Sequence, residues 1–135
     1  MKKFLASWFL SLLSMISLSY IWHGVVLNDL RNVNYPEWYF FILLLIVYSI
    51  IAFLLTLIFN YAEPQKSVLT KGFFGGAAFG FFIYLVAFTL GISFKSGAVE
   101  HIVVDFVWQM IEQGVGGMLI AYVYSLAMRF ENAME

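Results

Sequence analysis

Residues 38–60, WYFFILLLIVYSIIAFLLTLIFN, decide the fold, because this long apolar stretch contains no charged side chain. A helix needs about 20 apolar residues to span the hydrocarbon core of a bilayer. Three further apolar stretches of similar length occupy residues 4–27, 72–94 and 101–124. We therefore predict an all-α integral membrane protein, a single domain over residues 1–135 with four antiparallel transmembrane helices.

The composition supports this class of protein. Hydrophobic residues make up 63% of the chain and charged residues 11%, against about 45–50% apolar residues in soluble domains. The short connections between the four stretches leave no room for an aqueous domain, which excludes a nucleotide-binding fold, a soluble catalytic domain and a nucleic-acid partner. The chain has no cysteine, which excludes disulfides, zinc–thiolate sites, iron–sulfur clusters and thiol catalysis.

The distribution of basic residues predicts the orientation. Four alternating spans would place five basic residues on one side of the membrane and two, Arg31 and Lys95, on the other. By the positive-inside rule both termini then face the cytoplasm. The five residues on the cytoplasmic side are Lys2, Lys3, Lys66, Lys71 and Arg129.

The first span has an alternative interpretation as a cleaved secretory signal, because Lys2 and Lys3 precede an apolar run that reaches Ser17 and Ser19. The apolar run continues to Leu27, however, which is longer than the ~7–15 residues of a signal core. We therefore expect a retained helix, whose serines allow close helix approach or bond to the preceding turn.

Polar side chains gather on one side of the span 101–124. A carboxylate at the middle of a membrane, here Glu112, costs a few kcal/mol or more unless it is protonated, hydrated or paired. At about 100° per residue, the other polar positions of this span fall on the same side of the helix. This polar stripe consists of His101, Asp105, Trp108, Gln109, Glu112, Gln113 and Gly116.

The stripe suggests contacts with the first helix. In the predicted topology His23 and Asp105 lie at comparable depth, so they are expected to meet as a hydrogen bond or ion pair. Glu112 lies about 10 Å deeper along the helix axis than Asp105, which is too far for the two to clamp one ion. A ladder from His101 to Glu112, linked by water, remains an alternative to a protonated Glu112 bonded to Gln109, to Gln113 or to a serine or tyrosine of another helix.

Metal and haem sites are weaker interpretations. His23, His101 and Asp105 could supply three metal ligands, but they lack the paired-histidine spacing of strong motifs. His23 and His101 could ligate a haem, but no attachment motif is present. We predict no metal and no cofactor.

Glycines at a spacing of four, Gly72, Gly76 and Gly80, open the third span. Such a surface lets a second helix backbone approach closely, either within the bundle or from another subunit. Gly114 and Gly117 form a second small surface on the fourth span.

A short echo links the first and fourth spans: Tyr20-Ile21-Trp22-His23 and Phe106-Val107-Trp108-Gln109 share the order aromatic, β-branched, tryptophan, polar. It is too short to indicate a duplication.

Three runs resemble small four-helix bacterial membrane protein families of unknown function: Trp22-His23-Gly24 followed by Asn28-Asp29, residues 79–84, and Val104 to Trp108. The resemblance covers most of the chain. It implies that a patch at the end of the first helix faces Asp105 and Trp108, in a protein of the bacterial cytoplasmic (inner) membrane, and it implies no activity.

These observations predict a small non-enzymatic membrane protein, an accessory or self-associating subunit whose partners are the lipid bilayer and a second copy or another membrane subunit. The alternative is a proton- or cation-coupled transporter or channel in which Asp105 and Glu112 exchange protons and His23 gates access. A third interpretation is a membrane enzyme or binding protein for a lipid or quinone.

Overall fold

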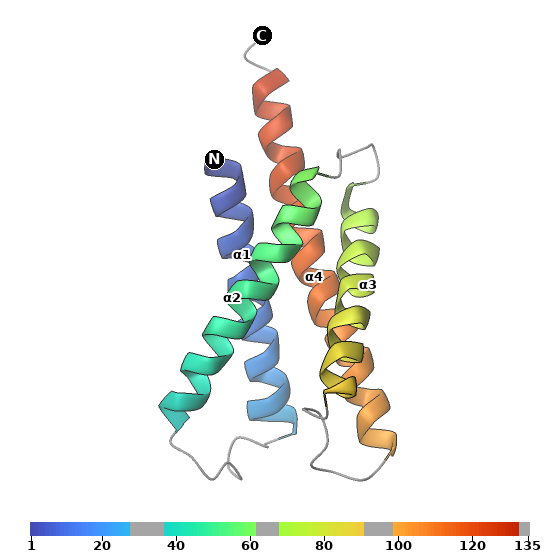
Figure 1. Cartoon of the computed structure of the whole chain (residues 1–135). Coiled ribbons are helices and arrows are strands. Elements are labelled where there is room, and N and C mark those ends of the chain that lie inside the picture. Colours follow the sequence, from blue (N-terminus) through green and yellow to red (C-terminus); the bar gives the residue numbers. More distant parts are fainter. Residues whose placement is uncertain (28–36, 62–67, 91–98, 133–135) are drawn as a thin grey trace.

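The computed structural model describes residues 1–27, 37–61, 68–90 and 99–132, without the side chains of residues 37, 40, 68, 99–101, 131 and 132. Its elements are α1 (Lys2–Tyr20), a π-helical segment η1 (Ile21–Val26) that continues α1, α2 (Glu37–Tyr61), α3 (Val68–Thr89) and α4 (Val99–Asn132), as Figure 1 shows. The prediction of an all-α chain with four helices is confirmed for the described residues.

Three of these helical segments are long and apolar enough to cross a membrane: Lys2–Val26, Phe41–Tyr61 and Leu69–Thr89. The fourth helix does not belong to this group, because the acidic and amide side chains of its first half lower its hydropathy. It is long enough, since a helix from Val99 to Asn132 exceeds the ~20 residues that a bilayer requires. A fourth crossing therefore stays a prediction.

The helix bounds differ from the predicted spans at α3 and α4. The third helix begins at Val68 rather than at residue 72, and the fourth continues to Asn132 rather than ending at residue 124. Apolar stretches underestimate a helix that runs past the hydrocarbon core, because its ends carry polar residues such as Lys71 and Arg129.

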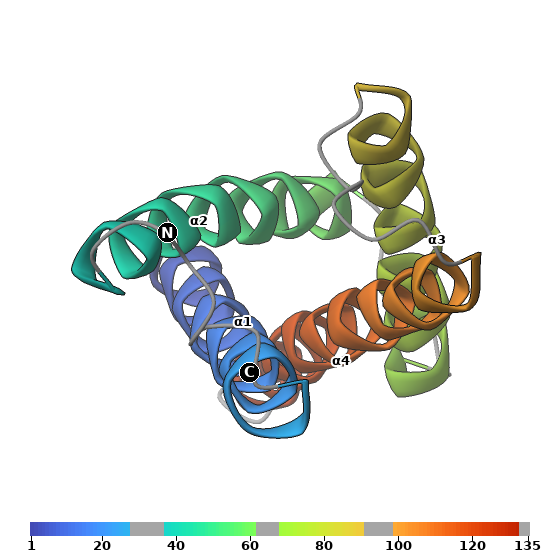
Figure 2. The same cartoon turned by 90° about the horizontal axis from the view of Figure 1, so that it is seen from below.

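Helix α4 is the central element, since it contacts each of the other three helices, most extensively α3. Figure 2 shows α4 between α1 and α3. The start of α1 and the end of α4 lie at the same end of the molecule, the upper end in Figure 1. The polar helix thus packs against all three apolar helices, which bury part of its surface.

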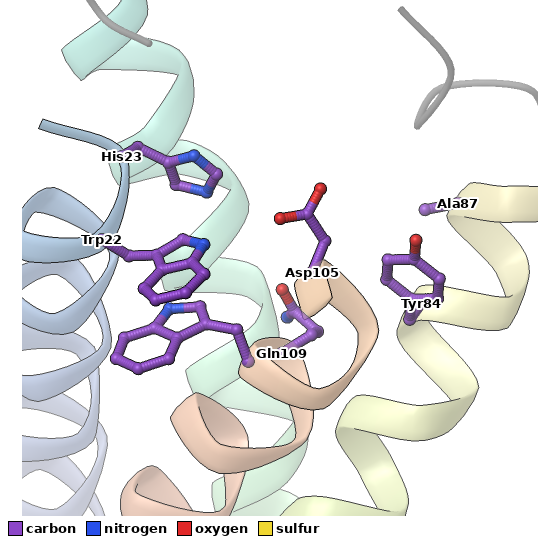
Figure 3. Close-up of a pocket in the computed structure, with 7 residues that line it drawn as sticks. Trp22, His23, Tyr84, Ala87, Asp105 and Gln109 are labelled. Atoms are coloured by element: carbon purple, nitrogen blue, oxygen red, sulfur yellow. The ribbon is translucent and has the colours of Figure 1, made fainter. Parts of the chain in front are cut away.

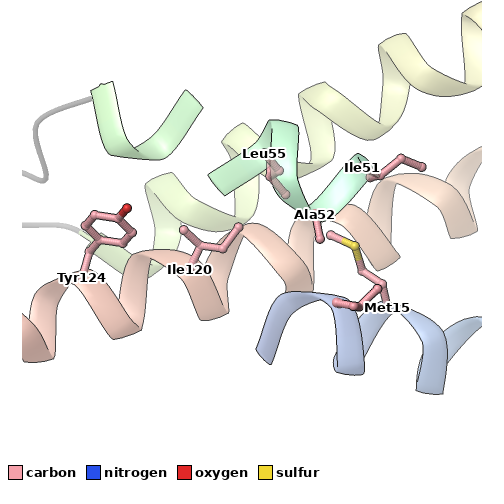
Figure 4. Close-up of a cluster of buried hydrophobic side chains, with 7 residues drawn as sticks. Met15, Ile51, Ala52, Leu55, Ile120 and Tyr124 are labelled. Atoms are coloured by element: carbon pink, nitrogen blue, oxygen red, sulfur yellow. The ribbon is translucent and has the colours of Figure 1, made fainter. Parts of the chain in front are cut away.

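The apolar core joins α1, α2 and α4. Its largest fully buried side chains, Met15, Leu55 and Ile120, are at most 1% exposed, and Figure 4 shows side chains of this cluster converging from the three helices. At one end of the cluster the Tyr124 hydroxyl donates a hydrogen bond to Oδ1 of Asn60, at 2.9 Å. The complete cluster consists of Leu12, Met15, Ile51, Ala52, Leu55, Ile120 and Tyr124.

Two serines of α1 illustrate bonding to a carbonyl of the preceding turn. Ser7 Oγ donates to the Lys3 carbonyl at 2.8 Å, and Ser17 Oγ donates to the Leu13 carbonyl at 2.8 Å. Bonding to the preceding turn lets a hydroxyl sit in an apolar environment without an intermolecular partner. The prediction of such bonds is confirmed for these serines.

The glycine surface of α3 packs on α4 of the same chain. A Cβ added to Gly72 would lie 2.8 Å from the Gly117 carbonyl oxygen, and one added to Gly80 would lie 2.7 Å from the Gln109 carbonyl oxygen. Gly76, between them, faces the Gln113 carbonyl oxygen. Only glycine permits this approach, so the two small surfaces predicted on α3 and α4 pack against each other.

Candidate functional site

A pocket of about 230 Å³ lies between η1, α3 and α4 (Figure 3). Of the described residues that line it, two come from η1, two from α3 and three from α4. It lies toward the lower end of the molecule in Figure 1, where η1 ends and α4 begins. The described residues that line it are Trp22, His23, Tyr84, Ala87, Asp105, Trp108 and Gln109.

Four predicted site residues therefore meet at one place. His23 and Asp105 line the pocket from opposite helices, together with Trp108 and Gln109. In Figure 3 the His23 ring and the Asp105 carboxylate lie on the two sides of the opening. His23 and Asp105, which were predicted to lie at comparable depth, thus line one pocket at the same end of the bundle.

The π-helical segment η1 carries Trp22 and His23. The Leu27 N–H donates to the Trp22 carbonyl at 2.8 Å, a bond across five residues that widens the turn. Single π-turns occur mostly inside α-helices and frequently at functional sites. The sequence carries no signal for this widening, since the run IWHGVV reads equally well as α-helix.

Trp22 and Trp108 stack face to face, with ring centroids 4.3 Å apart and planes inclined by 11°. The two stacked rings are the tryptophans of the two similar four-residue runs noted in the sequence, and they form one side of the pocket. The indole Nε1 atoms of both tryptophans are buried and have no hydrogen-bond partner among the described residues. By contrast, Nε1 of Trp8 donates to the Ser49 carbonyl at 3.0 Å.

Tyr84 fixes the opposite wall. Its hydroxyl donates to the Ile102 carbonyl at 3.0 Å, and its ring meets Phe106 edge-on at a centroid distance of 5.3 Å. The side chain is 9% exposed. Tyr84 was not predicted as a site residue, although it lies in one of the runs that resemble known families.

Glu112 lies one turn beyond Trp108, inside the bundle. It is 1% exposed, and its carboxyl interacts with the Tyr48 hydroxyl of α2. Tyr48 in turn donates to Ser19 Oγ of α1 at 3.0 Å. Glu112 Oε1 has no hydrogen-bond partner in the described part of the chain. A carboxyl and two hydroxyls from three helices thus form a small polar cluster. The sequence suggested a serine or tyrosine of another helix as a partner of Glu112 but did not single out Tyr48 or Ser19.

Gln113 faces another helix. It is fully buried, and its Cβ and Cγ lie against Gly80 of α3. Neither Oε1 nor Nε2 has a hydrogen-bond partner in the described residues. The predicted polar stripe is therefore divided: Glu112 points toward α1 and α2, and Gln113 points toward α3.

His101, which both the metal and the haem interpretations required, has its side chain outside the described part of the chain. Among the residues that the structure describes, no three histidine, aspartate or glutamate side chains gather as metal ligands would.

No protein-family model matches the chain, and no characterised protein or solved structure matches it either. The resemblance to small four-helix bacterial membrane proteins stays a prediction.

Proposed function

We propose that the protein is a proton-coupled carrier of a small solute, with four antiparallel spans in the bacterial cytoplasmic membrane and both termini cytoplasmic. The observation that carries this proposal is the buried Glu112 carboxyl, which keeps one oxygen without a hydrogen-bond partner among the described residues. Ionisable residues inside membrane helices are costly and mark proton or ion pathways.

The pairing of α1 with α4 supports the topology. Contacts join Lys3 to Tyr124, Met15 to Gly116, and Trp22 to Trp108. The position on α4 falls as the position on α1 rises, as it does for antiparallel helices. With the termini cytoplasmic, the pocket would open toward the outer face of the membrane.

The neighbourhood of the pocket supports coupling. Trp108 lines the pocket, and Glu112 follows it after one helical turn, a rise of about 6 Å. A solute in the pocket and a proton on Glu112 would therefore affect each other through one layer of side chains. Tyr48, the titratable side chain that interacts with Glu112, can accept or donate a hydrogen bond as the proton comes and goes.

The test is proton movement in vesicles of phosphatidylethanolamine and phosphatidylglycerol that contain a pH-sensitive dye. Three probes of similar size cover the charge classes: ethanolamine as cation, glycine as zwitterion and ethylene glycol as neutral solute. We expect one of them to accelerate proton movement several-fold in wild-type vesicles. Glu112→Gln, which keeps the shape of the side chain, should abolish the acceleration.

Glu131→Gln is the matched control, because it removes one carboxylate near the end of the same helix. It should leave the acceleration unchanged. Circular dichroism and size-exclusion chromatography establish that each variant is folded. The proposal fails if no probe accelerates proton movement, or if folded Glu112→Gln retains it.

An accessory or self-associating role is the second candidate that the sequence suggested. Its motivating feature was the glycine surface of Gly72, Gly76 and Gly80, and α4 of the same chain covers that surface. A partner subunit would need a different contact, so this role receives less support than transport.

A further inference from the structure

We infer that the pocket binds a small ammonium compound that also carries a hydrogen-bond-accepting oxygen, as a free amino alcohol or as the headgroup of a lipid. This compound is the carried solute only if the proposed proton-coupled function holds, whereas its binding depends on the pocket alone. The chemistry of the lining defines both ends of the ligand.

Asp105 defines the cationic end. Among the described residues that line the pocket it is the only acidic side chain, and none of these residues is a lysine or an arginine. A carboxylate at a partly desolvated position favours a positively charged partner, and hydrogen bonds between charged groups are about twice as strong as neutral ones. The aromatic rings around it add attraction for a cation.

The indole groups define the accepting end. The chain has four tryptophans, and Trp8 donates its N–H to a carbonyl while Trp38 is 63% exposed. Unsatisfied buried indole N–H groups thus occur, within the described residues, at the two tryptophans that line the pocket. In Figure 3 the nitrogen-bearing edge of Trp22 is turned toward Asp105 and Gln109. A buried donor without a partner is costly. Both Nε1 atoms are buried in this structure, so an oxygen on the ligand would satisfy one of them after a small shift of the indole ring.

The volume sets the size. A space of about 230 Å³ corresponds to roughly eight water molecules at about 30 Å³ each. An amine of four to eight non-hydrogen atoms fits such a space, with water in the remainder. The same ammonium and oxygen groups occur in the headgroup of phosphatidylethanolamine, which could enter from the membrane.

Equilibrium binding of radiolabelled ethanolamine to the full chain in phosphatidylglycerol nanodiscs tests the inference. Two competitors of matched size separate the two ends: propylamine keeps the ammonium and lacks the oxygen, and ethylene glycol keeps the oxygens and lacks the ammonium. We expect ethanolamine to compete at least several-fold better than propylamine and at least tenfold better than ethylene glycol. These comparisons use the unmodified protein and do not depend on a variant folding.

Variants assign the two ends. Asp105→Asn should weaken ethanolamine binding about tenfold or more, and should remove its advantage over ethylene glycol. Trp22→Phe and Trp108→Phe each remove one N–H donor. Each should therefore reduce the ratio of the ethanolamine affinity to the propylamine affinity. Trp38→Phe, which lies outside the pocket, should change neither the ethanolamine affinity nor its ratio to the propylamine affinity.

Adding phosphatidylethanolamine to the nanodiscs distinguishes the sources. If the headgroup is the ligand, this lipid will suppress ethanolamine binding; if the free amine is the ligand, binding will be unchanged. Ethylene glycol competing as well as ethanolamine, saturable binding untouched by Asp105→Asn, or no binding at all would each overturn the inference.

The outcomes are separable from those of the flux experiment. Ethanolamine binding without Glu112-dependent proton movement would leave an ammonium site in a protein that is not a carrier. Proton coupling driven by glycine or ethylene glycol, with no ethanolamine binding, would retain the carrier and reject the ammonium ligand.

Discussion

Gly76 of α3 lies directly on the backbone of Gln113 of α4. A Cβ at position 76 would overlap the Gln113 carbonyl oxygen and lie 3.0 Å from the Gly114 Cα. These neighbours are backbone atoms of a helix, which cannot rotate away as a flexible side chain can. The distance between α3 and α4 therefore depends on the missing side chain at Gly76.

Gly76→Ala is accordingly expected to destabilise the fold by about 1–3 kcal/mol, the usual cost of overpacking. Gly75 provides the matched control on the adjacent position. A Cβ there would meet only the tip of the Phe59 ring, at 3.1 Å, and alanine gains about 1 kcal/mol in helix propensity over glycine. Thermal unfolding in detergent, followed by circular dichroism, measures both variants.

Equal melting temperatures for the two alanine variants would show that α3 and α4 do not approach as closely as Gly76 and Gln113 indicate. A selective loss in Gly76→Ala, with the protein still monomeric, would locate the effect inside the chain. Dissociation of an oligomer without a loss of stability would instead favour the subunit contact that the sequence left open.

Gln113→Met is expected to stabilise the fold. The glutamine amide is fully buried, and both of its polar atoms have no hydrogen-bond partner within the described residues. A buried unsatisfied group costs about 1–3 kcal/mol, and methionine has nearly the same shape without the polar atoms. The melting temperature should rise, with a gain in unfolding free energy of about 1–3 kcal/mol.

Gln109→Met is the comparison, because Gln109 lines the pocket and is only partly buried. Water can satisfy its amide, so this change should have little effect on the melting temperature. A lower melting temperature for Gln113→Met would mean that a bound water or ion satisfies the Gln113 amide.

The sequence predicted the helices and the small surfaces of α3 and α4 because both depend on local regularities. Apolar length identifies a span, and the spacing of Gly72, Gly76 and Gly80 identifies one side of a helix. The composition of α4 also indicated where polar chemistry would gather. These features do not require knowledge of which helix lies opposite.

The division of the polar stripe was not predictable in this way. Trp108 and Gln113 are five residues apart, which at about 100° per residue separates them by about 140° around α4. An arc of that width reaches two neighbouring helices, so Trp108 meets α1 while Gln113 meets α3. Sequence periodicity predicts which residues lie on one side of a helix. How many neighbouring helices pack against that side depends on the tertiary structure.

The contribution of α2 to the polar cluster was missed for a related reason. Tyr48 lies in the most apolar stretch of the chain, and its aromatic ring fits the apolar character of the residues around it. Its hydroxyl finds Ser19 and Glu112 only because α1, α2 and α4 converge at that depth. A tyrosine in the middle of an apolar run, away from the membrane interface, is the signal that would have identified it.

The membrane crossing of α4 is the part of the topology that hydropathy leaves open, and labelling from the two sides of the membrane tests it. The chain contains no cysteine, so single variants give an unambiguous signal. Ser96→Cys and Ala133→Cys lie before and after α4 and leave the charge distribution unchanged. A membrane-impermeant maleimide applied to spheroplasts should modify the Ser96→Cys variant at once, and the Ala133→Cys variant only after permeabilisation.

Asn34→Cys and Ser67→Cys serve as the corresponding pair for α2, whose crossing is predicted from its apolar length. If positions 96 and 133 react from the same side while 34 and 67 do not, α4 does not cross the bilayer, and the burial of Glu112 among three spanning helices would need a different explanation.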